Sequence, residues 1–356
     1  MIHFSDLIKQ YENDLRTKYS QRLLPSHLSA LGAMQNCRTS DNIMMMAKCN
    51  QCQLKVAFPH SCGHRNCPHC QQFECQQWIE RQRSKLLPAT YYMVTFTIPA
   101  ELRDTAWRHQ RIVYSLLFKV AWQTLLSFGM NDKKLMGKLG ATAVLHTHSR
   151  ALDYHPHVHF ILPAGAINDK QRLWRKKKGK YLFRQKNLAL VFRAKMLAAL
   201  KEYQLSVFQK LPTKWVVDCK QMGKGDKALT YLGKYLYRGV LQEKNIIEHQ
   251  DGKVTFTYTD NMKTQRIRTL SGADFLWLIL QHILPRNFRR ARDFGFLHSN
   301  SKRIIHLLKI ILRCDTAISK PLSKRNQFCC AKCGAAMTII ATRLKLNTAN
   351  PLIGAT

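Results

Sequence analysis

Acidic residues are scarce in this chain, in which 21 Asp and Glu stand against 57 Lys and Arg among 356 residues. The resulting formal charge of +36 is far larger than solubility requires, and the basic residues are spread over the whole chain. This imbalance predicts a polyanionic partner, with nucleic acid as the first choice, and binding that weakens steeply as salt rises. A hydrophobic content of 46% excludes a disordered chain.

Long hydrophobic runs are missing as well. The longest, at residues 275–280 and 304–312, are too short and too interrupted to cross a bilayer. Residues 1–6 lack the basic start and apolar stretch of a secretory signal. We therefore expect a cytoplasmic protein, in which the 12 cysteines are metal ligands or free thiols rather than disulfides.

The pattern of apolar residues predicts interleaved helices and strands. Helical spacing occurs within residues 1–36, with Pro25 as an interruption, and within residues 101–128 and 188–203. Aromatic and β-branched runs predict strands at residues 91–98, 141–148, 157–162, 215–219 and 254–258, the last of them exposed. Several of these strands are neighbours joined by short loops. The predicted fold class is therefore α+β, with a mainly antiparallel sheet covered by helices rather than a doubly wound sheet.

Three consecutive domains follow from this pattern. Residues 1–88 are predicted to form an N-terminal helical and zinc-ribbon-like domain, and residues 89–300 a domain built on the sheet. Residues 301–356 are predicted to be a basic tail that contains a CxxC pair. No internal repeat is evident.

Five histidines lie within residues 146–159. His157 and His159 are separated by one residue, which places both imidazoles on one face of a strand. A hairpin centred near residues 151–152 would set His146 opposite His157 and His148 opposite His155, whereas a one-residue slip would turn half of these side chains away. A lone histidine usually packs in a core, but this cluster predicts a divalent metal site. We predict His157 and His159 as ligands, with His146 and His155 as candidates for a third ligand or an outer shell, and open positions for water and a phosphate oxygen.

Two tyrosines four residues apart, Tyr231 and Tyr235, share one face of a predicted helix. Lys234 and Arg238 gather on the same face, where we predict a catalytic role for Lys234 beside the tyrosines and a DNA contact for Arg238. The opposite face is apolar, with Leu229, Leu232, Leu236 and Val240. A phenol with a pKa of roughly 10 is a poor nucleophile at neutral pH, so it needs cationic neighbours or a metal that polarises the phosphate. The alternative, that both tyrosines are half-buried packing residues, stays open.

If such a tyrosine attacks a phosphodiester of DNA, the strand is cut and stays attached to the protein. The attachment also predicts how the cut strand could be rejoined. A phosphotyrosine ester conserves the energy of the broken phosphodiester, so rejoining needs no nucleotide cofactor. The Gly-rich phosphate loop of nucleotide-hydrolysing enzymes is indeed absent from this sequence.

The cysteines cluster in CxxC pairs. Cys49 with Cys52 and Cys67 with Cys70 are separated by fourteen residues, close to zinc-ribbon spacing, and predict a structural zinc site. Residues that could compete for this zinc or build a second site are Cys37, His60, Cys62, His64 and Cys75, and of these we predict Cys62 as a zinc ligand. Cys330 and Cys333 form a further CxxC without an evident partner pair, and metal binding there is left open.

Residues 174–181 form a basic loop with aromatic residues at both ends. Its cations are Arg175, Lys176, Lys177, Lys178 and Lys180. Aromatics among cations are typical of surfaces that hold single-stranded DNA. The alternative is a solvated, charged hairpin.

Taken in this order, several of these segments resemble the rolling-circle insertion-sequence transposases of the IS-ninety-one type, members of the HUH superfamily of single-strand endonucleases. The segments are residues 33–39, 61–70, 96–99, 144–147, 155–159, 231–235 and 284–286, and the likeness covers nearly the whole chain. The resemblance implies an antiparallel sheet with His157 and His159 on a central strand, and Tyr231 and Tyr235 as nucleophiles on a nearby helix. It also implies Mg or Mn as the working metal and a bacterial, nucleoid-associated protein.

The sequence therefore predicts an enzyme that nicks and rejoins single-stranded DNA at the ends of its own element through a 5′-phosphotyrosine. A plasmid replication initiator or a relaxase of the same chemistry is the nearest alternative, and the zinc segment and the lack of a helicase motif favour the transposase. A non-catalytic, zinc-dependent DNA-binding protein would explain the charge and the cysteines but not the histidines and tyrosines. A general RNA-binding role has no motif behind it.

Overall fold

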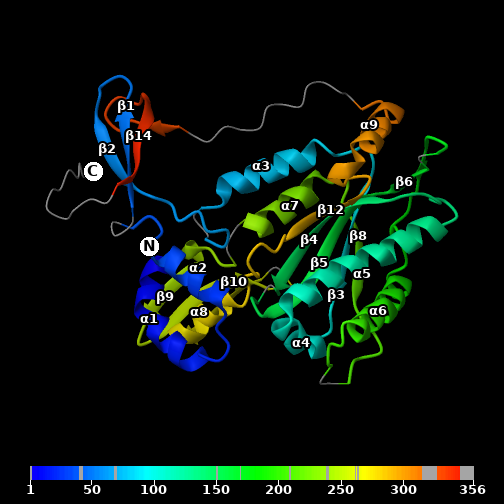
Figure 1. The fold of residues 1–356 in the computed structure, drawn as a ribbon, viewed down its shortest axis with the longest axis horizontal. Coiled ribbons are helices and arrows are strands. Elements are labelled where there is room, and N and C mark those ends of the chain that lie inside the picture. Colours follow the sequence, from blue (N-terminus) through cyan, green and yellow to red (C-terminus); the bar gives the residue numbers. More distant parts are fainter. Residues whose placement is uncertain are drawn as a thin grey trace. The chain divides into compact units, whose positions relative to one another are not determined.

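The computed structural model describes residues 2–39, 43–67, 70–149, 151–168, 170–207, 210–237, 240–260, 262, 264–314 and 327–344. Arg238, predicted to contact DNA, lies outside them. Contacts divide the chain into two compact units. Figure 1 shows the fold as a ribbon coloured along the sequence. Unit 1 combines Met1–Glu74, Tyr237–Ile283 and Ser323–Thr356, and unit 2 combines Cys75–Leu236 and Leu284–Leu322. The grouping by contacts therefore differs from three consecutive segments, because unit 1 draws on both ends of the chain.

Unit 2 is built on a five-stranded sheet in the order β12-β4-β5-β3-β8, and every neighbouring pair in it is antiparallel. The strands are β3 (Tyr91–Thr97), β4 (Gly140–His148), β5 (Tyr154–Pro163), β8 (Val217–Gln221) and β12 (Ala291–Gly295). The mixed α/β fold with antiparallel sheets is confirmed. The strand expected at residues 215–219 begins two residues later, at Val217.

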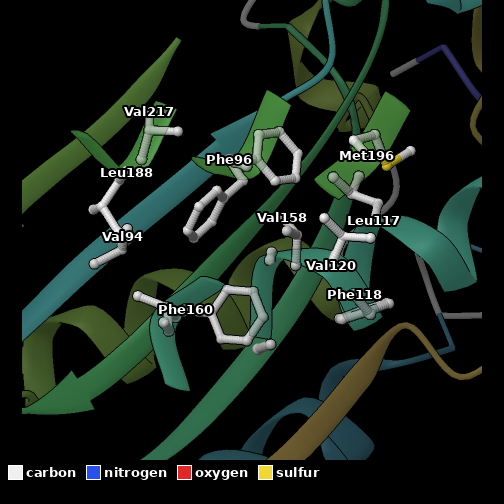
Figure 2. Close-up of a cluster of buried hydrophobic side chains, with 14 of the residues drawn as sticks. Val94, Phe96, Leu117, Phe118, Val120, Val158, Phe160, Leu188, Met196 and Val217 are labelled. Atoms are coloured by element: carbon white, nitrogen blue, oxygen red, sulfur yellow. The ribbon is translucent and has the colours of Figure 1, made fainter. Parts of the chain in front are cut away.

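One face of this sheet carries the hydrophobic core. Because side chains alternate along a strand, Phe96 of β3 and Val158 and Phe160 of β5 point to the same side. There they pack with Leu117 and Leu188, which come from the covering helices α5 (Gln110–Asn131) and α6 (Gln185–Glu202) (Figure 2). The alternation leaves the odd-numbered β5 positions, including His157 and His159, on the opposite face.

The long helix expected over residues 101–128 is interrupted. A short 3-10 turn, η1 (Ala100–Leu102), and helix α4 (Arg103–Arg108) precede α5, and His109 breaks the helix with φ −122° and ψ 43°. By length and composition α5 is apolar enough to span a membrane, but 56% of its apolar window is buried within the structure, as expected for a core helix.

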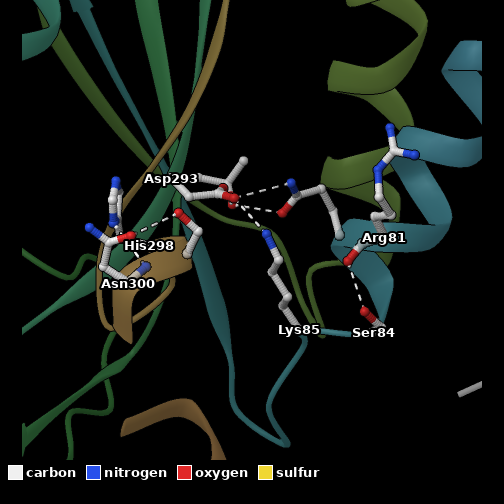
Figure 3. Close-up of polar contacts among 9 residues, drawn as sticks. Arg81, Ser84, Lys85, Asp293, His298 and Asn300 are labelled. Atoms are coloured by element: carbon white, nitrogen blue, oxygen red, sulfur yellow. Dashed lines mark hydrogen bonds and ion pairs between the residues drawn. The ribbon is translucent and has the colours of Figure 1, made fainter. Parts of the chain in front are cut away.

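The opposite face of the sheet is met by α3 (Gln72–Arg83) and α7 (Asp226–Tyr237). A polar cluster at the end of α3 fastens it to the sheet (Figure 3): Lys85 pairs with Asp293 of β12 at 2.6 Å, and Thr142 of β4 donates a hydrogen bond to the same carboxylate at 2.7 Å. Gln82 of α3 is buried and also contacts Asp293. Unit 2 further contains the hairpin of β6 (Gly165–Asn168) and β7 (Leu173–Lys176), the 3-10 turn η3 (Ser299–Ser301) and helix α9 (Lys302–Ile311).

Unit 1 contains a helical part and two antiparallel sheets. The helices are α1 (Phe4–Tyr19), α2 (Pro25–Gln35) and α8 (Gly272–Leu280), and Pro25 begins α2, a favoured place for proline. After the 3-10 turn η2 (Glu243–Asn245), one sheet joins β9 (Ile246–Gln250), β10 (Lys253–Thr259) and β11 (Gln265–Ser271). Val254 and Phe256 of β10 are buried, so the expectation of an exposed strand there is wrong for one of its faces.

The second sheet of unit 1 has the order β13-β14-β1-β2. It consists of β1 (Met44–Cys49), β2 (Lys55–Pro59), β13 (Phe328–Cys329) and β14 (Ala336–Leu344). Residues from near both ends of the chain therefore share one sheet.

Candidate active site

The β4–β5 hairpin sets the positions of the histidines. His146 lies opposite His157, as predicted, and Val144 lies opposite His159. A register shift follows His146, so His148 lies opposite Tyr154 rather than His155. The predicted pairing of His148 with His155 is therefore wrong, because the ladder shifts register after His146 and β5 contributes one extra residue there.

Three of the histidines converge. One ring nitrogen from each of His146, His157 and His159 lies within 4.8 Å of those of the other two. The ring centroid of His159 is 4.3 Å from that of His146 and 4.8 Å from that of His157. His155 does not belong to this group. Its Nδ1 atom accepts a hydrogen bond from the guanidinium of Arg103 at 2.7 Å.

Neighbouring groups select the ring nitrogens that face the cluster. The Nδ1 atom of His157 donates to the carbonyl of His155 at 2.7 Å, which directs Nε2 into the cluster. The Nδ1 atom of His159 lies 2.7 Å from the hydroxyl of Thr95, its neighbour on β3. In the part of the chain that the structure describes, the buried Nε2 atoms of His146 and His159 have no hydrogen-bond partner. Buried polar atoms are normally satisfied, so this arrangement fits a divalent cation held by three imidazoles.

Burial keeps these imidazoles neutral, which is the form that binds a metal. It lowers the pKa values of His146 and His159 well below that of an exposed histidine, and neighbouring histidines lower them further. Burial also lowers the pKa of His157 to about 3.

The tyrosine helix α7 lies against this histidine cluster. The ring of Tyr235 stacks on His146 with a centroid distance of 4.3 Å and an interplanar angle of 15°. The ring of Tyr231 lies 4.8 Å from that of Tyr235 and 6.3 Å from that of His159. Both tyrosines are half-buried, and Lys234 of the same helix is exposed. Two phenols and three imidazoles that are distant in the sequence thus form one site, which we call the histidine–tyrosine centre.

The leucine face of α7 is buried as its periodicity predicts, with Leu229, Leu232 and Leu236 at most 7% exposed. Helix α3 approaches α7 at Gly233. A Cβ atom built at Gly233 would lie 2.5 Å from Cγ1 of Ile79, so a larger residue has no room unless Ile79 moves. Cys75 of α3 donates to the Gly233 carbonyl at 3.1 Å. The glycine between the two tyrosines therefore allows α3 to hold the helix against the sheet.

Two charged contacts hold the ends of α7. At its start, Arg83 of α3 pairs with Asp226 at 2.6 Å. At its end, the guanidinium of Arg290 donates to the carbonyls of Tyr235 and Leu236 at 3.4 and 3.3 Å, where a cation also complements the helix dipole. Neither Arg290 nor Thr95 was predicted from the sequence. An arginine and a threonine in isolation carry no signal, because their roles depend on tertiary neighbours.

The basic loop is only partly available to a ligand. Lys177 forms an ion pair with Asp132 and lies over the ring of Phe183, and Trp174 is buried. The exposed members of the loop are Lys176, Lys178, Lys180 and Tyr181, while Arg175 is half-buried. These exposed residues remain candidates for contacts with DNA.

The cysteines form two separate groups, each with four sulfur atoms within 4.8 Å of one another. One group is Cys37, Cys62, Cys67 and Cys70, with the Sγ atom of Cys37 at 3.5 Å from that of Cys67 and 3.4 Å from that of Cys70. Tetrahedral zinc with Zn–S bonds of 2.3 Å separates its sulfurs by about 3.8 Å, so this group fits zinc. Cys62, predicted as a competitor, is a full member.

The other predicted pair does not join that group. Cys49 and Cys52 lie instead with Cys330 and Cys333. The expectation that the two N-terminal CxxC pairs share a site is therefore wrong. The equal spacing of CxxC pairs shows which cysteines bind together locally but not which two pairs meet.

Comparison with known proteins agrees with these groups. A family model described as "Putative transposase" matches residues 140–303, which include the histidines and tyrosines, and one described as "Transposase zinc-binding domain" matches residues 7–98. The chain is 29% identical over 318 residues to "Putative transposase y4qJ" of Sinorhizobium fredii, covering 82% of this chain and 79% of that protein. It is 26% identical over 364 residues to the "Transposase for insertion sequence element IS801" of Pseudomonas savastanoi pv. phaseolicola, covering 89% and 86%. No solved structure matches.

The fold, the zinc-fitting cysteines and these matches define the class of protein as a transposase, an enzyme that acts on DNA. Within that class, these matches relate the chain to the insertion-sequence transposases of the IS-ninety-one type, with a match to their zinc-binding domain at residues 7–98.

Proposed function

We propose that this transposase is an HUH-type endonuclease that nicks and rejoins single-stranded DNA at the ends of its element through a 5′-phosphotyrosine. The observation that carries this proposal is the stacking of Tyr235 on His146, which places the tyrosine helix directly over three convergent imidazoles. If the tyrosines only packed against the sheet, it would remain unexplained why the buried Nε2 atoms of His146 and His159 have no hydrogen-bond partner among the residues that the structure describes.

The cleavage step is a transfer of one phosphodiester. The phenol oxygen of Tyr231 or Tyr235 forms a bond to phosphorus, and the bond from phosphorus to the 3′-oxygen breaks. The phenolic proton is balanced by the proton that the 3′-oxygen gains, so the products are a 5′-phosphotyrosine and a free 3′-hydroxyl. Attack of a 3′-hydroxyl on the ester reverses the step and releases the tyrosine.

His146, His157 and His159 would hold Mg or Mn. Such an ion, when bound, polarises the phosphate and makes its phosphorus more electrophilic. The protein groups around it orient rather than react: Thr95 fixes the ring of His159, and Arg290 and α3 hold the tyrosine helix in place. Lys234 lies exposed on the same helix, where its charge would attract the DNA backbone and stabilise the negative charge that develops during the attack.

Two tyrosines permit two successive attachments, one for cutting and one for strand transfer, as rolling-circle transposition requires. Lys176, Lys178 and Lys180, with the half-buried Arg175, would hold the backbone of the single strand, while Lys177 already neutralises Asp132. We place this activity in the bacterial cytoplasm at the nucleoid, where its DNA lies.

The proposal is tested by incubating the full chain with end-labelled single-stranded DNA from its element and Mn, and separating the products in SDS. The wild type is expected to give an SDS-resistant protein–DNA adduct that depends on the metal. Tyr231→Phe with Tyr235→Phe should abolish the adduct, while Tyr203→Phe, an exposed tyrosine after α6, should leave it unchanged. DNA binding without an adduct in the wild type would instead support the non-catalytic DNA-binding protein.

A further inference from the structure

Four cysteines meet where the two ends of the chain form one sheet. Cys49 ends β1 and Cys52 lies in the loop that leads to β2, whereas Cys330 and Cys333 lie in the loop between β13 and β14. The Sγ atoms of Cys49 and Cys333 lie 3.5 Å apart, and so do those of Cys52 and Cys330. Each loop therefore contributes to both close sulfur pairs.

The two loops repeat the same backbone hydrogen bond. In the first loop, the N–H of Cys49 donates to the carbonyl of Leu54 at 2.8 Å. In the second, the N–H of Cys330 donates to the carbonyl of Ala335 at 2.8 Å, again five residues onward.

A left-handed residue follows the second cysteine of each loop. It is Gln53 with φ 59° in one loop and Gly334 with φ 73° in the other. Two loops that are about 280 residues apart thus share one conformation, related as the two halves of a zinc ribbon are.

Backbone N–H groups in both loops are directed at sulfur. Those of Cys52 and Gln51 lie 3.4 Å from the Sγ atom of Cys49. The N–H groups of Cys333 and Lys332 are likewise hydrogen-bonded to the sulfur of Cys330. Backbone donors of this kind complement the negative charge of a metal-bound sulfur.

Contacts outside the loops hold the two hairpins together. Strand β1 pairs with β14, with Cys49 opposite Met337. The side chain of Thr338 donates to that of Asn50 at 2.8 Å, and the rings of Phe58 and Phe328 stack at 5.1 Å. The loops are therefore fixed face to face by groups that are not metal ligands.

We propose that Cys49, Cys52, Cys330 and Cys333 form a second structural zinc site, which joins the two ends of the chain and which we call the chain-end zinc site. Four thiolates in a compact group select zinc over oxygen-preferring cations. The matching family models cover residues 7–98 and 140–303, so they contain Cys49 and Cys52 but not the other two ligands. The site is distinct from the group around Cys37 and independent of the proposed DNA cleavage.

This site makes the sheet that contains β1 and β2 dependent on a distant segment of the chain. The ligands Cys330 and Cys333, and the strand partner β14, are synthesised about 280 residues after β1, so the sheet is completed only after that segment exists. A copy that ends before residue 330 would lack half of the zinc ligands and one neighbour of β1.

The test replaces bound zinc by Co²⁺ in the full chain and counts thiolate-bound ions from the sulfur-to-cobalt charge-transfer band, to which imidazole sites do not contribute. The wild type should hold two such ions. Cys330→Ser with Cys333→Ser should hold one, and so should Cys49→Ser with Cys52→Ser. The variant that carries all four substitutions should also hold one, because both pairs belong to the same site.

Controls separate this result from general unfolding. Cys329→Ser, an exposed neighbour outside both groups, should keep two thiolate-bound ions. Cys333→His should also keep two, with the shifted cobalt spectrum of three sulfurs and one nitrogen. Two ions retained in the Cys330→Ser/Cys333→Ser variant would overturn the proposal, as would identical behaviour of Cys333→His and Cys333→Ser.

Discussion

The histidine–tyrosine centre and the chain-end zinc site are assembled in opposite ways. The proposed metal ligands of the centre come from one hairpin, with His146 directly opposite His157, so the pairing of two strands that are neighbours in the sequence brings them together. The ligands of the chain-end zinc site come from two hairpins that are far apart in the sequence, and the pairing of β1 with β14 brings them together. In the first case the metal ligands follow from local structure, whereas in the second they depend on long-range pairing.

The two sites also differ in how many coordination positions of the metal the protein would fill. The cysteine group supplies four sulfurs, a complete tetrahedral shell that excludes a substrate. The histidine group supplies three nitrogens beneath two phenols, which leaves coordination positions for water and phosphate. A coordination shell filled by protein ligands serves folding, whereas a shell with open positions serves chemistry.

The largest effect on DNA cleavage is expected when two of the three histidines of the centre are replaced. His157→Ala with His159→Ala should lower the rate of DNA cleavage by about 10³-fold or more, because no group then polarises the phosphate. The number of cysteine-bound metal ions should stay at two. Cleavage of labelled single-stranded DNA measures the rate, with His298→Ala as a control outside the site. A decrease in the cleavage rate of less than about tenfold would show that these histidines do not carry the chemistry, and the distinction between the two sites would fail.

Gly233→Ala should lower cleavage by up to about 10²-fold, because the added methyl group meets Ile79 and shifts the tyrosine helix relative to the histidines. The matched double variant Gly233→Ala/Ile79→Ala restores the space and should recover most of the rate. Single-turnover kinetics at saturating metal would measure both. If the double variant were no better than the single one, α3 would not position the tyrosines.

Thr95→Val keeps the shape of the side chain but removes the hydroxyl beside Nδ1 of His159. The metal affinity of the centre should fall by about 10- to 100-fold, as is typical when the partner of a ligating histidine is lost. The Mn concentration for half-maximal cleavage reports this change, while the rate at saturating Mn should be largely retained. Thr95→Ser should restore the affinity. An unchanged midpoint in Thr95→Val would show that Thr95 does not orient His159.

The smallest effects are expected in the backbone of the two cysteine loops. Gln53→Gly should stabilise the chain-end zinc site by about 1 kcal/mol, because glycine adopts a positive φ without steric cost. Gly334→Ala should destabilise it by a similar amount at the equivalent position. Competition with a chelator measures both free energies. Effects of equal sign for the two substitutions would contradict the equivalence of the loops.

Features governed by local spacing were predicted well from the sequence. The apolar stripe of α7 and the opposition of His146 and His157 both follow from helix and strand periodicity. The bulge that separates His148 from His155 was not predictable, because a single inserted residue leaves no mark on the hydrophobic pattern.

Features governed by distant pairing were missed. All three CxxC pairs have the same local pattern, so nothing in the segment around Cys49 indicates that its partners lie at Cys330 and Cys333 rather than at Cys67 and Cys70. The contact of Arg290 with the end of α7 was likewise hidden, because it depends on how β12 and its preceding loop pack in the fold.

The central claim is that Tyr231 and Tyr235 are the phenols that attack DNA. The most direct measurement is trypsin digestion of the purified protein–DNA adduct, followed by mass spectrometry of the peptide that carries the nucleotides. Cleavage after Lys227, Lys234 and Arg238 separates the two tyrosines, with Tyr231 in residues 228–234 and Tyr235 in residues 235–238. Nucleotide on either peptide, lost from the first in Tyr231→Phe and from the second in Tyr235→Phe, is the predicted result. Nucleotide on any other peptide, or cleavage that leaves a free 5′-phosphate and no attached peptide, would contradict the account.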